Sequence, residues 1–401
     1  MDQNGGCIAL LSLGAAVPKY RAKQAEVGRW MANSFEGQPA LGRWLRSLYA
    51  NSGIETRYAC VPDFLEPPAR SRFAPGRALT DAATTAERMA IYEREAVALG
   101  TTAGCQALAA YGDARQSELI AVINSITHLI VVSCTGFFAP GLDLAIAQRL
   151  NLAPTVERML IGFMGCAAAF NGLRAATQIV KGQPSARVLV ICVELCSIHI
   201  QPGTERENLI SASLFADGAS ACLVGVAEAN QGHIFEIGGF HTSVKPETRA
   251  EMVWQIGDYG FALRLSPQIP DHLAEAAPAA LQTLLNGDPR PQFWAIHPGG
   301  RAIVDRLVDI FQLKPEQVTA SRSVLRQFGN LSSATIFFVL AELQRKLSRE
   351  VVGKKVEGVA MAFGPGLVIE MARLAYIPPA QEALREAVSG RAEAFAGVEF
   401  T

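Results

Sequence analysis

Residues 127–195 open with THLIVVSC (127–134), continue with GCAAAFNGLRAATQIV (165–180) and close with ARVLVICVEL (186–195). The first and last runs are continuously apolar, which is typical of strands buried on both faces. The middle run consists largely of small residues and good helix formers. A strand, a helix and a strand in this order predict an α/β chain with mostly parallel sheets covered by helices.

The same alternation extends over most of the chain. Further strands are predicted at 219–227, 293–300 and 358–366, and further helices at 84–100, 142–150 and 332–347. Residues 62–80 are rich in Pro and Arg and predict a loop. The polar stretch AEANQG (227–232) separates two halves. We therefore expect an N-terminal half over 1–230, a C-terminal half over 231–377 and a tail over 378–401.

Composition excludes several classes of protein. Half of the 401 residues are hydrophobic and 18% are charged, which rules out a disordered chain. The net charge of −1 argues against nucleic acid or an anionic membrane surface as the main partner. The apolar runs are shorter than a membrane span and the N-terminus does not resemble a secretory signal. We therefore expect a soluble, cytoplasmic protein.

The cysteines predict neither a disulfide framework nor a metal site. None of the eight forms a C-x-x-C pair, and the density is too low for a disulfide-stabilised domain. Cys192 and His199 lack a convergent set of further ligands, so no metal is expected.

Cys166 is the cysteine with the most distinctive surroundings. Gly162 and Gly165 precede it, and a run of alanines follows. This pattern places the thiol near the N-terminus of a buried helix, where the helix dipole favours a thiolate. The small neighbours leave room for a substrate. The alternative is a core cysteine at a close helix contact.

His297 and Asn330 are the other candidate reactive residues. His297 ends the apolar strand FWAI, and Pro298 and the glycines after it break that strand before a helix. It can pair with a thiolate or move protons, unless it is simply a hydrogen-bonded strand-end histidine. Asn330 follows Gly329 and precedes a predicted helix. It is either an amide donor for an oxyanion or a turn and cap residue.

Taken together, these segments resemble one family over almost the whole chain, from Ile8 to Tyr376. The chain is similar to type III polyketide synthases, the chalcone/stilbene synthase-like branch of the thiolase-like fold. SCTG (133–136) and ELCS (194–197) are closer to bacterial alkylpyrone and alkylresorcinol synthases. The other segments that carry the resemblance are SGIETRY (52–58), GFMGCAAAFNGLRAA (162–176), LFADGASACLVG (214–225), FWAIHPGG (293–300), FGNLSSA (328–334) and FGPG (363–366).

The resemblance implies a five-layered αβαβα fold made of two similar halves. It implies that Cys166 carries the acyl group and that His297 and Asn330 complete a catalytic triad. The expected reaction is iterative decarboxylative Claisen condensation of malonyl-CoA onto an acyl-CoA starter, followed by ring closure. The starter is expected to be fatty acyl and the product an alkylpyrone rather than a resorcinol or other phenol. A homodimer with no carrier protein, no metal and no organic cofactor is expected.

The resemblance also implies a substrate cavity with several departures from the plant pattern. Phe215 corresponds to a gatekeeper aromatic, and Leu263 lies near a second gatekeeper position without its ring. Trp254 falls where plant enzymes have a small glycine, which would shorten or reshape the pocket. The remaining expected cavity residues are Cys134, Thr135, Cys196, His199, Ser332, Gly364, Pro365 and Gly366.

The expected CoA site is the least regular part of the resemblance. The family's basic positions hold Trp44, Ser47 and Asn51 in this chain. Arg43 and Arg46 lie one helical turn apart and can substitute from neighbouring positions, or they form a solvated surface pair. The remaining CoA-binding candidates are Arg57, Gly299 and Gly300.

Two alternatives have the same general fold. A ketoacyl-carrier-protein synthase III-like condensing enzyme would share the Cys/His/Asn set, but it usually has a His-Gln-Ala-Asn segment where HPGGRA (297–302) stands. A catalytically silent scaffold homologue would have lost one of the three residues, and all three are present. A nucleotide-binding protein is disfavoured because no phosphate-binding glycine motif follows a predicted strand.

Overall fold

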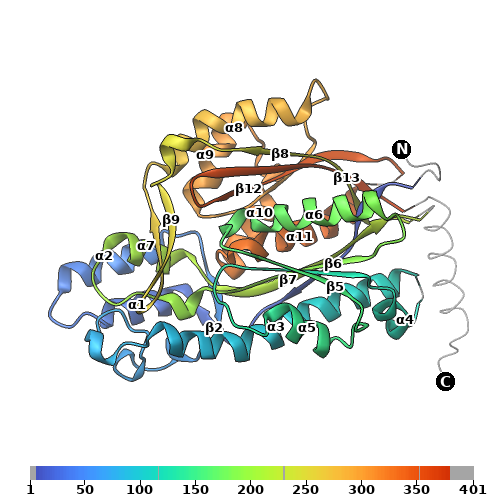
Figure 1. Cartoon of the computed structure of the whole chain (residues 1–401). Coiled ribbons are helices and arrows are strands. Elements are labelled where there is room, and N and C mark those ends of the chain that lie inside the picture. Colours follow the sequence, from blue (N-terminus) through green and yellow to red (C-terminus); the bar gives the residue numbers. More distant parts are fainter. Residues whose placement is uncertain (1–5, 116, 229–230, 352, 380–401) are drawn as a thin grey trace, which may run out of the picture.

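The computed structural model describes residues 6–115, 117–228, 231–351 and 353–379 (Figure 1). Nine strands form one sheet in the order β11-β12-β13-β8-β1-β7-β6-β4-β5. Their bounds are β1 Ile8–Ala16, β4 His128–Ser133, β5 Glu157–Gly162, β6 Val188–Leu195, β7 Asp217–Val226, β8 Ile234–Ser243, β11 Phe293–Ile296, β12 Val356–Gly364 and β13 Val368–Ile377. Strands β2 (Tyr20–Lys23) and β3 (Thr56–Ala59) form a two-stranded antiparallel sheet, and β9 (Met252–Gly257) and β10 (Gly260–Leu265) form a hairpin. The expected tail lies largely outside the described residues.

The large sheet is mixed, so the expectation of mostly parallel sheets is wrong. Only the pairs β4–β5, β4–β6 and β11–β12 are parallel. The other neighbours, including β6–β7 and β12–β13, run antiparallel. A continuous apolar run indicates only that a strand is buried on both faces. Helices on both sides of a sheet bury antiparallel strands in the same way, so the run does not reveal the direction of pairing.

The two halves repeat one topology, as expected. In the first half β4, β6, β7 and β1 lie side by side, paired parallel, antiparallel and antiparallel. In the second half β11, β12, β13 and β8 lie side by side with the same three relations. The halves join through a short antiparallel contact between β1 and β8. Strand β5 adds an edge to the first half.

Helices complete the five layers (Figure 1). One outer layer is formed by α3 (Thr85–Arg115), α4 (Leu119–Asn124) and α5 (Leu142–Arg149), and the other by α8 (Ile269–Leu285) and α9 (Arg301–Phe311). Between the two parts of the sheet lie α6 (Ala168–Gly182), α10 (Thr319–Phe328) and α11 (Thr335–Glu350). The layered α/β fold thus agrees with the sequence-based expectation.

The remaining helices gather at one end of the layers, together with β9 and β2 (Figure 1). They are α1 (Gln24–Asn33), α2 (Pro39–Ala50) and α7 (Arg206–Leu214). Residues 62–80, expected to be a loop, contain only short 3₁₀ turns. Among the helices that the structure describes, none combines the length and the apolar character needed to cross a membrane.

The central helices have apolar faces that explain their position. The buried residues of α6 include Phe170, Leu173 and Val180, and those of α11 include Ile336, Phe337 and Leu340. Both helices contribute to one hydrophobic cluster with residues of both halves. At about 25 cal/mol per Å² of apolar surface, burial of this kind is the main force that fixes their N-terminal turns in place. Cys166 lies in the turn that leads into α6, and Asn330 lies two residues before the turn that leads into α11.

Candidate active site

One cavity of about 610 Å³ lies where the ends of β4, β6 and β11 meet α7 and the β9–β10 hairpin. This volume is typical of a small-molecule site. Its wall contains most of the residues that the sequence predicted for the site: Cys134, Thr135, Cys166, Cys196, His199, Phe215, Trp254, Leu263, His297, Gly299, Gly300, Asn330, Ser332 and Pro365. Segments from both halves of the chain therefore build one site.

Cys166 lies in a 3₁₀ turn, Gly165–Ala167, that leads directly into α6. Gly165 has φ 65° and packs so closely on Pro365 that a Cβ at this position would lie 2.1 Å from the Pro365 Cδ. The turn therefore requires glycine, because φ and space both exclude a side chain. Cys166 is 8% exposed and its remaining surface faces the cavity.

Burial controls the charge of Cys166. It raises the pKa of the thiol to about 12, while the Ser332 and Asn330 side chains lower it by less. Burial thus opposes the thiolate that the helix dipole was expected to favour. The reason is that taking an anion out of water costs more than one helix N-terminus returns.

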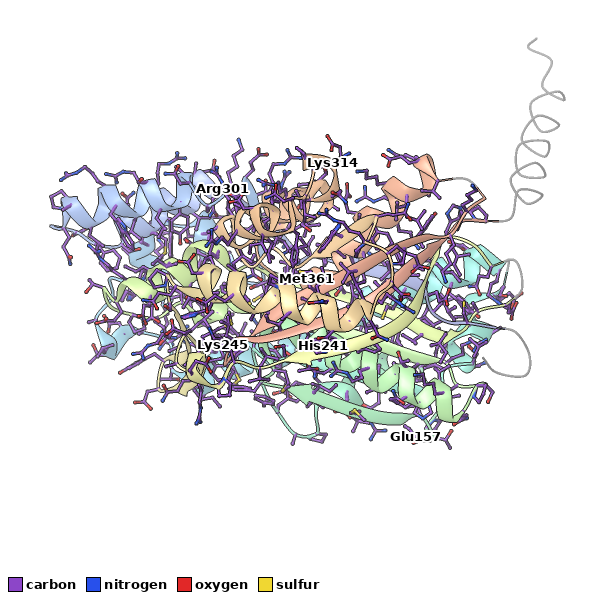
Figure 2. All side chains as sticks on the ribbon, turned by 90° about the horizontal axis from the view of Figure 1, so that it is seen from above. Glu157, His241, Lys245, Arg301, Lys314 and Met361 are labelled. Atoms are coloured by element: carbon purple, nitrogen blue, oxygen red, sulfur yellow. The ribbon has the colours of Figure 1, made fainter. Side chains whose placement is uncertain are left out.

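His297 follows β11 directly and anchors its backbone by donating its N–H to the Met361 carbonyl of β12, at 2.8 Å. Met361 lies in the middle of the molecule (Figure 2). Among the described residues, neither ring nitrogen of His297 has a hydrogen-bond partner. Burial lowers the pKa of the imidazole to about 3. If His297 were simply a strand-end histidine, its ring would be hydrogen-bonded within the protein. Because the ring is buried and unpaired, it instead points to a hydrogen-bond partner supplied by a ligand.

Asn330 has a side chain held on both sides. Its Nδ2 donates to the Gly299 carbonyl at 3.1 Å, and its Oδ1 accepts from the Ser332 backbone N–H at 2.8 Å. The Cys166 Sγ lies 4.0 Å from the same Oδ1. One of the two Nδ2 hydrogens remains free, because the Gly299 bond uses the other. Asn330 thus has the turn role, and its remaining hydrogen is compatible with the expected donor role.

Cys134 and Thr135 form the part of the cavity wall beside the turn Gly165–Ala167, which contains Cys166. The Cys134 Sγ accepts from the Gly165 N–H at 3.1 Å, so this thiol supports the turn. Thr135 donates its hydroxyl to the Glu194 carboxylate, at 3.0 Å, and Ser333 donates to the other carboxylate oxygen. Burial raises the pKa of Glu194 to about 7. The sequence analysis missed Glu194, although a carboxylate inside the apolar run ARVLVICVEL is itself a signal.

An aromatic wall closes another side of the cavity. Trp254 donates its Nε1 proton to the Cys134 carbonyl at 2.7 Å. His199 accepts from the Phe261 N–H at Nδ1, at 3.0 Å, so its Nε2 must donate to the Thr135 carbonyl at 2.7 Å. The His199 and Phe261 rings stack at 4.4 Å. Trp254 thus lines the cavity as expected, and the sequence gives no separate signal for Phe261.

Two expectations about the loop at 364–366 need correction. Pro365 lines the cavity, whereas its neighbours Gly364 and Gly366 are not part of the wall. Gly364 instead packs against the Met164 carbonyl and Ala167, where a Cβ would lie at 2.8 and 3.2 Å. Gly366 donates its N–H to the Met252 carbonyl, at 2.9 Å. These glycines shape the two turns rather than contact a substrate.

The arginines expected at a CoA site are not part of the cavity wall. Arg43 and Arg46 are exposed on α2, which leaves the solvated-pair alternative in place. The basic residue that does line the cavity is Arg206 at the start of α7, and its guanidinium lies over the Trp44 ring at 5.5 Å. Gly299 and Gly300 line the cavity at the start of α9, where Arg301 lies on the surface (Figure 2).

The expectation that Arg57 binds CoA needs correction. Its side chain is only 1% exposed and is not part of the cavity wall. Nη1 donates to the carbonyls of Ala212 and Phe215, at 2.7 and 2.9 Å. The guanidinium is therefore directed at the backbone of the C-terminal end of α7 and not at a CoA phosphate.

Comparisons with known proteins agree with this architecture. The pattern of the N-terminal domain of chalcone and stilbene synthases matches residues 1–228, and that of their C-terminal domain matches residues 240–378. The chain is 30% identical over 367 residues to "Alpha-pyrone synthesis polyketide synthase-like Pks18" of Mycobacterium tuberculosis, covering 89% of this chain and 88% of that protein. It is 30% identical to "Type III polyketide synthase 21" of Oryza sativa subsp. japonica, covering 91% and 92%.

Solved structures show the same similarity. PKS-I of the brown alga Ectocarpus siliculosus superposes with a TM-score of 0.83 and 30% identity, covering 94% of this chain and all of that one. The C-terminal type III polyketide synthase domain of Steely1 from Dictyostelium superposes with a TM-score of 0.82. At 24% identity, with 92% and 99% of the two chains covered, that match shows the fold alone.

The layered fold and the matches over both halves define the class of protein: it is a condensing acyltransferase. More particularly, the chain belongs to the chalcone and stilbene synthase family, the type III polyketide synthases.

Proposed function

We propose that this protein extends an acyl-CoA starter by repeated decarboxylative Claisen condensation with malonyl-CoA, through an acyl group held on Cys166. The observation that carries the proposal is the convergence of Cys166, His297 and Asn330 on one apolar cavity. The buried His297 ring has both nitrogens free for a substrate. The reaction then needs no metal or organic cofactor, because decarboxylation itself generates the carbon nucleophile.

Acyl loading is the first step. The neutral thiol and the neutral imidazole are the forms that burial favours. As the Cys166 Sγ attacks the starter thioester carbonyl, His297 takes the thiol proton, and the C–S bond to CoA breaks. The departing CoA thiolate receives that proton, which leaves an acyl-Cys166 thioester and free CoA. His297 is neutral again for the next step.

Malonyl-CoA then loses carbon dioxide. The pair of electrons from the broken C–C bond forms an enolate, whose negative charge develops on the thioester oxygen. The free Nδ2 hydrogen of Asn330 and an N–H of His297 can donate to that oxygen. The enolate carbon attacks the acyl-Cys166 carbonyl and the thiolate leaves, so the chain is two carbons longer and again a CoA thioester. The apolar walls keep water from protonating the enolate.

The starter and the ring closure are the finer part of the proposal. We propose a fatty acyl starter and an alkylpyrone product in preference to a resorcinol or other phenol. One supporting fact is the similarity to Pks18, whose name describes α-pyrone synthesis. The other is a cavity wall with many apolar residues, including Ile210, Leu214 and Ile303. Trp254 limits the length of the chain that fits.

We also propose that the protein acts as a homodimer in the cytoplasm, without a carrier protein. The edge strand β5 exposes Met159 and Leu160, and Phe137 and Met164 are exposed on the segments next to it. Glu157 marks this strand at the margin of the molecule (Figure 2). An unpaired edge with large apolar side chains is a surface that a second copy of the chain would cover.

The experiment is product mass spectrometry on purified protein supplied with malonyl-CoA and acyl-CoA starters from acetyl to long-chain and aromatic. Products heavier by whole ketide units, formed by the wild type and not by Cys166→Ala, are expected. A parallel reaction with malonate on a carrier protein tests the synthase III-like alternative. Extension only with the carrier-bound substrate, or from no starter at all, would contradict the proposal.

A further inference from the structure

We propose that Arg57 is a positioning residue that fixes the gatekeeper Phe215 and, through it, the amide of Asn330. The proposal rests on the proposed function only in assigning Asn330 to enolate stabilisation. Its basis is a buried cation bound to backbone carbonyls at the C-terminal end of α7.

The C-terminal end of α7 lies inside the protein and needs hydrogen-bond donors. The last carbonyls of a helix have no partner within the helix, and burial makes each unpaired one costly. Arg57 donates to Ala212 and Phe215, at 2.7 and 2.9 Å. Gln24, also buried, donates to the Ser213 carbonyl between them at 2.8 Å. Two residues far away in the sequence therefore cap this helix end.

The same segment is bonded to the candidate active site. The Leu214 carbonyl accepts from the Asn330 N–H at 2.9 Å, and the Asn330 carbonyl accepts from the Ala216 N–H at 2.9 Å. Phe215 and Asn330 thus face each other across a two-bond bridge. A shift of the α7 terminus would move both residues, since no loop lies between them to absorb it.

The charge of Arg57 fits a helix C-terminus. A cation there interacts favourably with the helix dipole. No ion pair in the described part of the chain includes Arg57. Its guanidinium instead lies 5.3 Å from the Tyr49 ring and 5.2 Å from the Phe64 ring, and Phe64 lines the cavity. Aromatic faces and carbonyls therefore hold the cation without a carboxylate that would compete for it.

The site depends on this arrangement because Asn330 must present one hydrogen to a developing oxyanion. An error of 1 Å in the position of such a donor costs about 100-fold in rate. Arg57 does not line the cavity itself, so it acts only through the wall residues that it holds, Phe215 among them.

The test measures malonyl-CoA decarboxylation and acyl loading separately, as carbon dioxide release and as the mass of acyl-Cys166. The variants are Arg57→Met, which removes the cation at similar length, and Arg57→Lys, which keeps the charge but is too short to reach both carbonyls. Arg29→Met, an exposed arginine on α1, is the matched control. We expect Arg57→Met to slow decarboxylation about 10- to 100-fold, with a smaller effect on loading. Arg57→Lys should lose less thermal stability than Arg57→Met, but it should still slow decarboxylation.

A double-mutant cycle with Asn330→Ala distinguishes positioning from general destabilisation. If Arg57 acts through Asn330, Arg57→Lys slows decarboxylation in the wild type and has no further effect in the Asn330→Ala background. Fully additive effects, or decarboxylation and loading that fall in proportion to the folded fraction, would overturn the proposal. If Arg57→Met does not fold, the cycle with Arg57→Lys still decides it. Absence of decarboxylation in the wild type would count against the proposed function itself.

Discussion

The turn before α6 and the turn before α11 occupy equivalent places in the two halves. Each is a 3₁₀ turn, Gly165–Ala167 or Ser332–Ala334, and each leads into a buried central helix that precedes the matching strand, β6 or β12. One turn contains Cys166, and the other begins two residues after Asn330. A repeated scaffold thus brings the Cys166 Sγ within 4.0 Å of the Asn330 Oδ1 although 164 positions separate the two residues.

The two turns are held in different ways. The Cys166 turn is fixed by close packing on Pro365 and by the Cys134 sulfur. Asn330 is fixed by hydrogen bonds to the backbone of Phe215's neighbours and to Gly299. The difference teaches that two equivalent turns can be held in place by different means, one mainly by close packing and the other by backbone hydrogen bonds.

A second equivalent pair extends the comparison. Cys134 follows β4 and His297 follows β11, the matching strands of the two halves. Cys134 uses its sulfur to support the backbone, while the ring of His297 has no partner among the described residues. In this second pair, one side chain supports the backbone and the other remains open toward the cavity.

The largest effect is expected from the cysteines. Cys166→Ala should abolish extended products, a loss of more than about 1,000-fold, because no other thiol can hold the acyl chain at this point. Cys134→Ala should lower the rate less than about 10-fold, since it removes one weak support of the turn. Both are measured by product mass spectrometry with one starter. Equal losses in the two variants would mean that both cysteines take part in the chemistry.

The pH dependence of Cys166 alkylation is the next effect in size. A thiol pKa near 12 and an imidazole pKa near 3 leave both groups neutral between pH 5 and 9. Because the thiolate is the reactive form, iodoacetamide modification should accelerate about 10-fold per pH unit from 7 to 10. Peptide mass spectrometry on Cys166 provides the rate. A rate that is constant above pH 6 would reveal a thiolate–imidazolium pair instead.

A smaller effect, on the stability of the protein, is expected from a substitution in the Cys166 turn. Gly165→Ala places a Cβ against Pro365 at a positive φ, and overpacking of this kind costs about 1–3 kcal/mol. Gly182→Ala, at the exposed end of the same helix, meets no atom within 4 Å and is the control. Thermal unfolding should show a lower Tm for the first variant only. Equal Tm values would show that the turn adapts to a side chain.

The smallest effect concerns the choice of starter. Trp254→Phe removes the hydrogen bond to the Cys134 carbonyl but keeps an aromatic wall, whereas Trp254→Ala opens the wall. We expect Trp254→Ala to shift the preferred starter by a few carbons, and Trp254→Phe to change it little. Competition between starters of different length, read by mass spectrometry, measures the shift. An unchanged preference in Trp254→Ala would remove Trp254 as a length determinant.

Much of the fold was predictable because burial leaves a local pattern. The apolar runs at 127–134, 186–195 and 358–366 coincide with β4, β6 and β12, and the helical patterns coincide with α5, α6 and α11. The direction of pairing was not predictable, because a strand buried on both faces reads the same in parallel and antiparallel sheets. The helix predicted at 84–100 runs on to Arg115 as α3, since nothing in its composition marks an end.

The sequence predicted which residues belong to the site better than it predicted their contacts. Cys166, His297 and Asn330 were recognised from their local sequences, and the structure brings all three to one cavity. Arg57 was misplaced because a basic residue near a predicted CoA site reads as a phosphate ligand, while its real contacts are carbonyls 155 and 158 positions away. Arg206 was missed because only the fold brings the start of α7 to the cavity, whereas Glu194 was missed although a carboxylate within an apolar run is a signal.

The sequence by itself determined the layered α/β class, the two halves and the residue types available for chemistry, because periodicity and short motifs are local properties. Only the tertiary structure decided the charge state of Cys166, the freedom of the His297 ring and the burial of Arg57. Those properties depend on desolvation and on hydrogen-bond partners, which are supplied by segments that are distant in the chain and meet only when the two halves fold together.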